Sequence, residues 1–242
     1  MRILEVVGLT KRFGRRTALD AVSFTVEEGQ ILGLFGPAGA GKTTCLHCLS
    51  GFAKPDSGRV IFDGREVTLE PPGRLARAGL ARVLPIARVS RTRTAADEVL
   101  AALDRRRPPG LAGLLAGWRG RGTRPEAIEL LDRVGLAAAA EEKVHRLSPE
   151  MLRRLQLALA LAWTPRMILL DEPLGGLPDG EAHAIADLIA GLRAGGLTVL
   201  LAERQSPVAM ALVDRAAVLD RGIVVASRPP TRVSADARMA EA

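Results

Sequence analysis

Apolar and polar residues alternate in two stretches near the start of the chain, residues 2–9 and 21–29, and this pattern predicts two β-strands. Residues 14–19, GRRTAL, are expected to form the turn between them. Residues 58–67, GRVIFDGREV, predict a second hairpin that turns at the Asp-Gly pair 63–64, because this pair adopts the backbone of a tight hairpin turn readily. The chain is therefore expected to begin with antiparallel β-structure.

Farther along the chain, short apolar runs alternate with stretches of helical spacing. Three continuous apolar runs predict buried strands: residues 30–36, 166–173 and 197–203. Helical spacing predicts helices over residues 41–52, 149–163 and 180–196, and over residues 95–136 with interruptions at RRRPPG and RGRGTRP. Residues 215–227 predict a closing hairpin, whereas residues 70–95, rich in Pro and Arg, have no assignable period.

This order of elements predicts an α/β fold built on a mainly parallel sheet. An antiparallel β piece is expected at the N-terminus, and a helical insertion at about residues 95–160. We expect one domain, 1–242, that contains this insertion, since 242 residues are sufficient for one large α/β domain.

Composition supports a packed protein outside the bilayer. Hydrophobic residues make up 48% of the chain and charged residues 25%, so global disorder is not expected. No apolar run approaches the roughly 18 residues that a membrane span needs, and the first residues contain no secretory h-region. These features predict a soluble intracellular protein.

The net charge of +7 comes almost entirely from Arg, because Lys occurs only at positions 11, 42, 54 and 143. Few aromatic residues accompany these cations, so a nucleic-acid partner is not expected. A solvated Arg-rich surface explains the charge.

Cys45 and Cys48 form a C-x-x-C motif with His47 between them. One interpretation is a redox pair or half of a metal site, but no second Cys pair accompanies it. The favoured interpretation is two small apolar side chains on the core face of a helix.

The segment GPAGAGKTT, residues 36–44, matches G-x-x-x-x-G-K-[ST] between a predicted strand and a predicted helix. Its glycines let backbone N–H groups surround phosphates, and the helix N-terminus adds partial positive charge. Lys42 is expected to reach the β- and γ-phosphates and Thr43 to ligate Mg²⁺. The predicted phosphate-binding residues are Gly36, Pro37, Ala38, Gly39, Ala40, Gly41, Lys42, Thr43 and Thr44.

Two acids follow the apolar run MILL: Asp171 and Glu172. A carboxylate at the end of a buried strand suits a Mg²⁺ site, so Asp171 is expected to act through the metal and its water. Glu172 is expected to act as the general base on the attacking water. The guanine-specificity motif N-K-x-D is absent from the sequence, which favours ATP as the nucleotide.

The order of phosphate loop, long insertion, LS-helix and LLDEP resembles the ATP-binding subunits of ABC transporters over nearly the whole chain. LTKRFG, the VGL before the LS-helix, the closing D-x-R-x-x-E-A and the insertion GLAGLLAGWRG resemble subunits of branched-chain amino acid importers. The resemblance implies that Phe13 stacks on adenine. It also implies transmembrane permease subunits, a second ATPase subunit, a periplasmic or extracellular binding protein, and a peripheral position on the cytoplasmic face of the membrane.

Several positions depart from the family pattern. The glutamine that senses Mg²⁺ and the membrane subunit aligns with Pro85, which has neither a side-chain amide nor a backbone N–H. The Asp or Asn after the catalytic Glu aligns with Pro178. The switch histidine aligns with Arg204, a permanent cation that can attract phosphate but cannot act as a neutral donor and acceptor.

The signature loop departs as well, since LSPEM, residues 147–151, stands where the family has LSGGQ. In the family this loop clamps, in trans, the γ-phosphate held by the opposite subunit. Ser148 of the family motif is retained, and it is expected to cap the helix and to contact the opposite subunit's phosphate weakly. Pro149 is expected at the first helical position. Pro149 removes a donor, and Glu150 adds a repulsion on the order of 3 kcal/mol at about 5 Å and a dielectric of about 20.

The resemblance therefore implies an importer ATPase for branched-chain or related amino acids, with slow or asymmetric hydrolysis in a heterodimer. The alternative is a regulatory or structural subunit that binds ATP and barely turns it over. A non-transport ATPase of the same superfamily fits less well, because the sequence carries no tandem domains or long coiled coils. A lipopolysaccharide-export ATPase shares the closing motif and normally lacks the Gly- and Leu-rich insertion.

Overall fold

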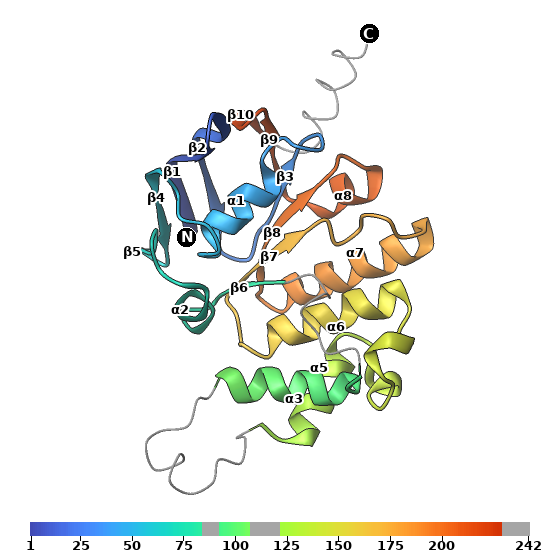
Figure 1. The fold of residues 1–242 in the computed structure, drawn as a ribbon. Helices are drawn as coiled ribbons and strands as arrows, with labels where there is room; N and C mark the ends of the chain where they lie inside the picture. Colours follow the sequence, from blue (N-terminus) through green and yellow to red (C-terminus); the bar gives the residue numbers. More distant parts are fainter. Residues whose placement is uncertain (84–91, 107–121, 229–242) are drawn as a thin grey trace, which may run out of the picture. The chain divides into compact units, whose positions relative to one another are not determined.

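A computed structural model describes residues 1–83, 92–106 and 122–228 of the chain (Figure 1). These residues belong to two compact units, Met1–Arg82 with Arg166–Ala242, and Val83–Pro165. We call them the first unit and the second unit. Pro85, the insertion segment at 110–120 and the closing motif after residue 228 lie outside the described residues.

The N-terminal part of the first unit forms the expected antiparallel sheet. Its strands are β1 (Arg2–Phe13), β2 (Arg16–Glu27), β4 (Ser57–Phe62) and β5 (Arg65–Glu66), in the order β2-β1-β4-β5. The predicted turn over residues 14–19 is wrong, because Phe13 already pairs with Arg16. Backbone hydrogen bonds extend both strands through polar residues, and only Gly14 and Arg15 are left for the turn.

The predicted hairpin at Asp63-Gly64 is confirmed. Strands β4 and β5 pair antiparallel, and both turn residues have positive φ, 50° for Asp63 and 74° for Gly64. This is the backbone that a two-residue hairpin turn needs, and Asp-Gly adopts it at low cost.

The second sheet of the first unit has the order β10-β9-β3-β8-β7-β6. Its strands are β3 (Ile31–Phe35), β6 (Leu80–Arg82), β7 (Met167–Asp171), β8 (Thr198–Glu203), β9 (Arg215–Asp220) and β10 (Ile223–Arg228). All neighbours are parallel except β9 and β10, so the mainly parallel sheet and the closing hairpin are confirmed. The three predicted apolar runs are β3, β7 and β8.

Among its described residues, the first unit has four helices: α1 (Lys42–Leu49), α2 (Pro72–Arg77), α7 (Asp179–Ala194) and α8 (Pro207–Leu212). The pattern predicted α1 and α7 but missed α2, β6 and α8. Helices of six residues and a strand of three are too short to show a hydrophobic period.

A hydrophobic core joins the two sheets and α1 of the first unit. Alternate residues of the parallel strands contribute to it, and so do Cys45 and Cys48 of α1, which are 0% and 2% exposed. The prediction that the C-x-x-C pair lies on the core face of its helix is confirmed. Burial raises the pKa of Cys45, and it raises that of Cys48 to about 11.

The second unit contains the predicted helices of the insertion. They are α3 (Ala95–Arg106), α5 (Arg124–Arg133) and α6 (Pro149–Leu161), with short 3₁₀ turns at Ala137–Ala139 and Val144–Arg146. The three long helices pack on one another. Thr123 and Ser148 cap α5 and α6, and each side chain accepts a backbone N–H bond from the residue three positions later.

Within the described residues, no helix is both long enough and apolar enough to cross a membrane.

Burial of Cys45 and Cys48 predicts low thiol reactivity in the folded protein. A pKa near 11 for Cys48 leaves about 100-fold less thiolate than an ordinary pKa near 9 at pH 8. With iodoacetamide at pH 8, we expect no adduct on the native protein under conditions that alkylate both thiols of the urea-unfolded chain, as measured by intact mass. Rapid double alkylation of the native protein would instead support the redox interpretation.

Candidate functional site

Four of the five parallel strands described in the first unit bring candidate site residues to one edge of the sheet. Strand β3 pairs with β8, β8 with β7 and β7 with β6, so the carboxyl ends of these strands are neighbours. The chain continues from these ends into Gly36, Arg204, Glu172 and, at the end of β6 itself, Arg82. Polar side chains from distant parts of the sequence are thereby brought to one place, as is usual for ligand sites in open α/β sheets.

The phosphate-loop motif occupies the connection from β3 to α1. A Cβ on Gly36 would lie 2.1 Å from the carbonyl oxygen of Leu219, and one on Gly41 would lie 2.5 Å from that of Ala18. Only glycine fits at these two places. Gly41 is the N-cap of α1 and supplies no side-chain acceptor, so the first N–H groups of the helix are left for another acceptor such as an anion.

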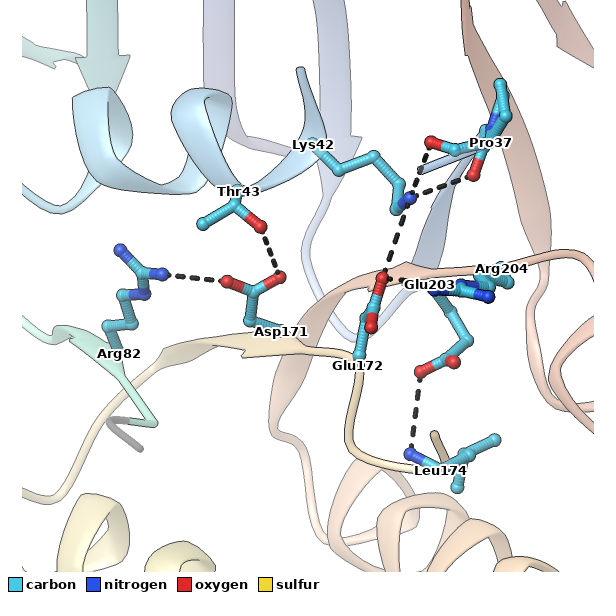
Figure 2. A network of polar contacts seen from close by, with 10 residues as sticks. Pro37, Lys42, Thr43, Arg82, Asp171, Glu172, Leu174, Glu203 and Arg204 are labelled. Atoms are coloured by element: carbon cyan, nitrogen blue, oxygen red, sulfur yellow. Dashed lines mark hydrogen bonds and ion pairs between the residues drawn. The ribbon is translucent and has the colours of Figure 1, made fainter. Parts of the chain in front are cut away.

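Lys42 is buried beneath this loop, with 4% of its side chain exposed. Its ammonium group donates hydrogen bonds to the carbonyl oxygens of Gly36 at 2.8 Å and Pro37 at 3.1 Å. It also lies 3.7 Å from Oε1 of Glu172 (Figure 2). A desolvated cation next to glycine N–H groups is a strong site for a polyphosphate.

Thr43 and Asp171 face each other from α1 and β7. The Thr43 hydroxyl donates to Oδ1 of Asp171 at 3.2 Å, and Oδ2 of Asp171 accepts from Nη2 of Arg82 at 2.9 Å (Figure 2). A hydroxyl oxygen beside a carboxylate oxygen is a hard donor pair of the kind that Mg²⁺ selects together with substrate phosphates. The residues present therefore fit the metal that the sequence implies.

Glu172 has a left-handed backbone, with φ of 46°. This conformation costs a non-glycine residue roughly 1–2 kcal/mol, and the hydrogen bond from its N–H to the carbonyl oxygen of Ala202, at 2.8 Å, helps to hold it. Two cations are near its Oε1, Lys42 at 3.7 Å and Nε of Arg204 at 3.9 Å. The carboxylate thus stands beside the phosphate loop with its charge partly compensated.

Glu203, at the end of β8, is a buried carboxyl with 4% exposure. Its Oε2 accepts a hydrogen bond of 3.4 Å from the N–H of Leu174, in the loop after Glu172. Burial raises the pKa of Glu203 from 4.5 to about 7; the N–H groups of Leu174 and Arg204 oppose the increase, and Glu172 adds to it. A proton on Glu203 therefore titrates near neutral pH.

A cavity of about 410 Å³ opens over the phosphate loop, a size suited to a small-molecule ligand. Its lining comprises Phe13, Arg16, Ala18, Ala38, Gly39, Gly41, Lys42, Thr43, Thr44 and Glu172. The Phe13 side chain is 55% exposed, and the ammonium group of Lys11 lies 5.4 Å from its ring centroid. An aromatic ring, a cationic loop and a hard oxygen pair are the features that a nucleoside triphosphate with Mg²⁺ requires.

Comparisons with known proteins agree with this geometry. A family model described as ABC transporter matches residues 19–175. The chain belongs to the ABC transporter family. It is 36% identical over 237 residues to the high-affinity branched-chain amino acid transport ATP-binding protein BraF of Pseudomonas aeruginosa, a match that covers 96% of this chain and 93% of BraF.

A second relative and a solved structure support the same family. LptB of Acidithiobacillus ferridurans, a lipopolysaccharide export system ATP-binding protein, is 35% identical over 234 residues, covering 97% of this chain and 93% of LptB. The crystal structure of the ADP conformation of MJ1267, an ATP-binding cassette of an ABC transporter, matches with a TM-score of 0.88 at 28% identity. That match covers 100% of this chain and 98% of MJ1267. The chain is accordingly an ABC ATPase subunit that binds nucleotide.

Most of the predicted site residues of this ABC ATPase subunit come together in the first unit. The phosphate-loop residues 36–44, Phe13, Asp171, Glu172 and Arg204 all lie there, whereas Ser148 lies in the second unit. Pro178, which the family resemblance aligned with an Asp or Asn, is the N-cap of α7 and offers no side-chain hydrogen bond there.

The signature segment of this subunit begins α6 in the second unit. The Ser148 hydroxyl accepts the N–H of Met151 at 3.2 Å, and Pro149 is at the first helical position, as expected. Glu150 binds Arg154 one turn later, at 2.7 Å to Nε and 2.6 Å to Nη2, and their side chains are 24% and 19% exposed. A carboxylate paired in this way repels a phosphate less than the 3 kcal/mol expected for an unpaired Glu150.

Sequence reasoning missed three charged residues of this site. Arg82 lay in the unassigned region, and its partner Asp171 is 89 positions away in sequence. Glu203 was recognised only as the end of a strand, and Arg16 only as part of a turn. The signal for Glu203 was an acid directly after a buried apolar run, the same signal that identified Asp171.

The raised pKa of Glu203 predicts pH-dependent stability. Between about pH 4.5 and 7 the folded protein keeps a proton that the unfolded chain has lost, so the free energy of unfolding falls as pH rises through this window. Glu203→Gln removes the titration and keeps an acceptor for Leu174. We expect the variant to equal the wild type near pH 4.5 and to be about 2 to 3 kcal/mol more stable at pH 8.

Urea unfolding at both pH values measures this difference. The exposed Glu129 of α5, changed to Gln, is the control and should show no pH-dependent difference from the wild type. An offset for Glu203→Gln that is the same at both pH values would contradict the assignment.

Proposed function

We propose that this chain is the ATP-hydrolysing subunit of an importer for branched-chain or related amino acids. It would act at the cytoplasmic face of the membrane with transmembrane permease subunits, a second ATPase subunit and, indirectly, a periplasmic or extracellular binding protein. The similarity to BraF over nearly the whole of both chains supports this choice. The 35% identity to LptB makes lipid export the transport class against which the proposal has to be tested.

The observation that carries the hydrolytic part of the proposal is the convergence of Lys42, Thr43, Asp171 and Glu172 at one edge of the sheet. Residues 36–44 and Lys42 would hold the phosphates of ATP, and Phe13 would stack on adenine. Thr43 and Asp171 would hold Mg²⁺, which supplies charge neutralisation for the phosphates when bound. Glu172 would accept a proton from the attacking water.

The departures from the family pattern support a heterodimer with unequal sites. Pro149 offers no backbone donor to a phosphate, and Glu150 is committed to Arg154 within its own helix. The signature loop of this chain is thus a poor clamp for a second copy. Its phosphate loop, which is complete, would pair with an intact signature loop on a different ATPase subunit.

The position of Arg204 supports a second candidate, a regulatory subunit that binds ATP and barely hydrolyses it. Arg204 replaces the switch histidine and approaches the same Glu172 oxygen as Lys42 does. Ion pairs with two cations would hold this carboxylate oxygen away from an attacking water.

Turnover of the wild type and of Glu172→Gln distinguishes these candidates. If the chain is a working ATPase, the purified wild type alone should be slow and should accelerate about tenfold or more with its permease and second ATPase subunit. Glu172→Gln should then lose more than about 100-fold of that turnover, because the general base is lost, while nucleotide binding remains. Transport that is unaffected by Glu172→Gln would establish the regulatory candidate, and rapid turnover of the chain alone would contradict the unequal-site proposal.

Restoring glycines at the signature loop tests the clamp directly. The double variant Pro149→Gly, Glu150→Gly returns a backbone donor and removes a carboxylate, so ATPase activity of the chain alone should rise by about fivefold. Arg154→Gln is the control, since it breaks the Glu150 pair, leaves that carboxylate uncompensated and should lower activity. No gain in the double variant, with α6 intact by circular dichroism, would mean that the signature loop does not limit turnover.

A further inference from the structure

Arg82 is a buried arginine that the sequence pattern did not reveal. It ends β6, the edge strand of the parallel sheet, and pairs in register with Leu169 of β7. Only 4% of its side chain is exposed. A permanent cation at such a depth needs a partner, because its desolvation alone costs several kcal/mol.

One partner of Arg82 is Asp171, and the two oxygens of this carboxylate make separate contacts. Nη2 of Arg82 donates to Oδ2 of Asp171 at 2.9 Å, while Oδ1 of Asp171 accepts from Thr43 at 3.2 Å (Figure 2). Each carboxylate oxygen therefore has its own partner, and rotation of the carboxylate about χ2 would break both contacts. Oδ1 of Asp171 thus stays beside the Thr43 hydroxyl, and these two oxygens form the hard donor pair suited to Mg²⁺.

The guanidinium itself is held by the far end of α1. Nη1 of Arg82 approaches the Ser50 hydroxyl at 3.4 Å, and that hydroxyl donates to the carbonyl oxygen of Leu46 at 2.5 Å. The ring of Phe52 lies 5.9 Å from the guanidinium carbon. Since Thr43 lies at the start of the same helix, Arg82 ties the Asp171 carboxylate to both ends of α1.

We propose that Arg82 is the positioning residue of the metal site: it orients Asp171 so that Oδ1 faces Thr43. Arg82 would not ligate the metal itself, and it acts only through Asp171. This inference rests on the proposed binding of a Mg²⁺–nucleotide pair by this site. Partners of ligating carboxylates typically change metal affinity by about 10- to 100-fold when they are lost.

The test is the Mg²⁺ dependence of nucleotide binding, measured with a fluorescent ATP analogue and no turnover. In Arg82→Gln, the Mg²⁺ concentration for half-maximal enhancement of binding should rise about tenfold, because Asp171 is no longer oriented. Binding of the analogue in EDTA should stay within about twofold of the wild type, since Lys42 and the phosphate loop are untouched. Arg82→Lys, which keeps the charge without the planar fork, should recover part of the loss.

Two further variants separate positioning from a merely structural role. In an Asp171→Asn background, Arg82→Gln should have no additional effect on the Mg²⁺ dependence, because the two residues act as one unit. Ser50→Ala removes a support of the guanidinium and keeps the ion pair, so it should give a shift of about twofold even if Arg82→Gln folds poorly. Arg77→Gln, on the exposed face of α2, is the matched control and should equal the wild type.

The outcomes are distinct from those that test the proposed function. If the wild type fails to bind the analogue, the proposed function fails. If the wild type binds it with Mg²⁺ dependence and both Arg82→Gln and Ser50→Ala match it, the positioning role is wrong. Tighter Mg²⁺ dependence in Arg82→Gln would also overturn the proposal, because Arg82 would then be a competitor of the metal for Asp171.

Discussion

The parallel register of β3, β8, β7 and β6 is the constraint on which the site depends. It sets the carboxyl ends of four strands side by side, although the strands come from both ends of the first unit. A slip of one residue would turn the side chains of a strand to the opposite face. The observed registers pair Phe35 with Glu203, Asp171 with Ala202 and Arg82 with Leu169, so strand pairing determines where the charges meet.

Charge balance at this edge is achieved between residues of different strands. Lys42 and Arg82 are buried cations, and each is close to a carboxylate from the end of β7, Glu172 and Asp171 respectively. Lys42 also donates to the carbonyl oxygens of Gly36 and Pro37, and Asp171 also accepts from Thr43, so neutral hydrogen bonds share in compensating these charges. Below about pH 7 Glu203 is neutral, so it adds no further negative charge to this edge of the sheet.

The sequence predicted the features that lie within one short segment, and it missed those that depend on contacts between distant segments. Lys42, Thr43 and the glycines act within one loop, so their spacing alone identified them, and Asp171 and Glu172 followed directly from an apolar run. The left-handed backbone of Glu172 and the pairing of Arg82 depend instead on strand order, which residue spacing does not encode. The short elements α2, β6 and α8 escaped notice because they lack a full hydrophobic period.

Two demands can be made on the LSPEM segment: it starts helix α6, and in the family the same loop clamps a phosphate. Ser148 caps α6, Pro149 suits its first position, and Glu150 gains a partner in Arg154 one turn later, so each residue favours the helix. Two glycines in the same first turn would start that helix less well. Stability alone therefore accounts for Pro and Glu at these positions. The Pro-Glu pair therefore leaves the start of α6 intact, and the proposed loss of phosphate clamping concerns only the second demand on this loop.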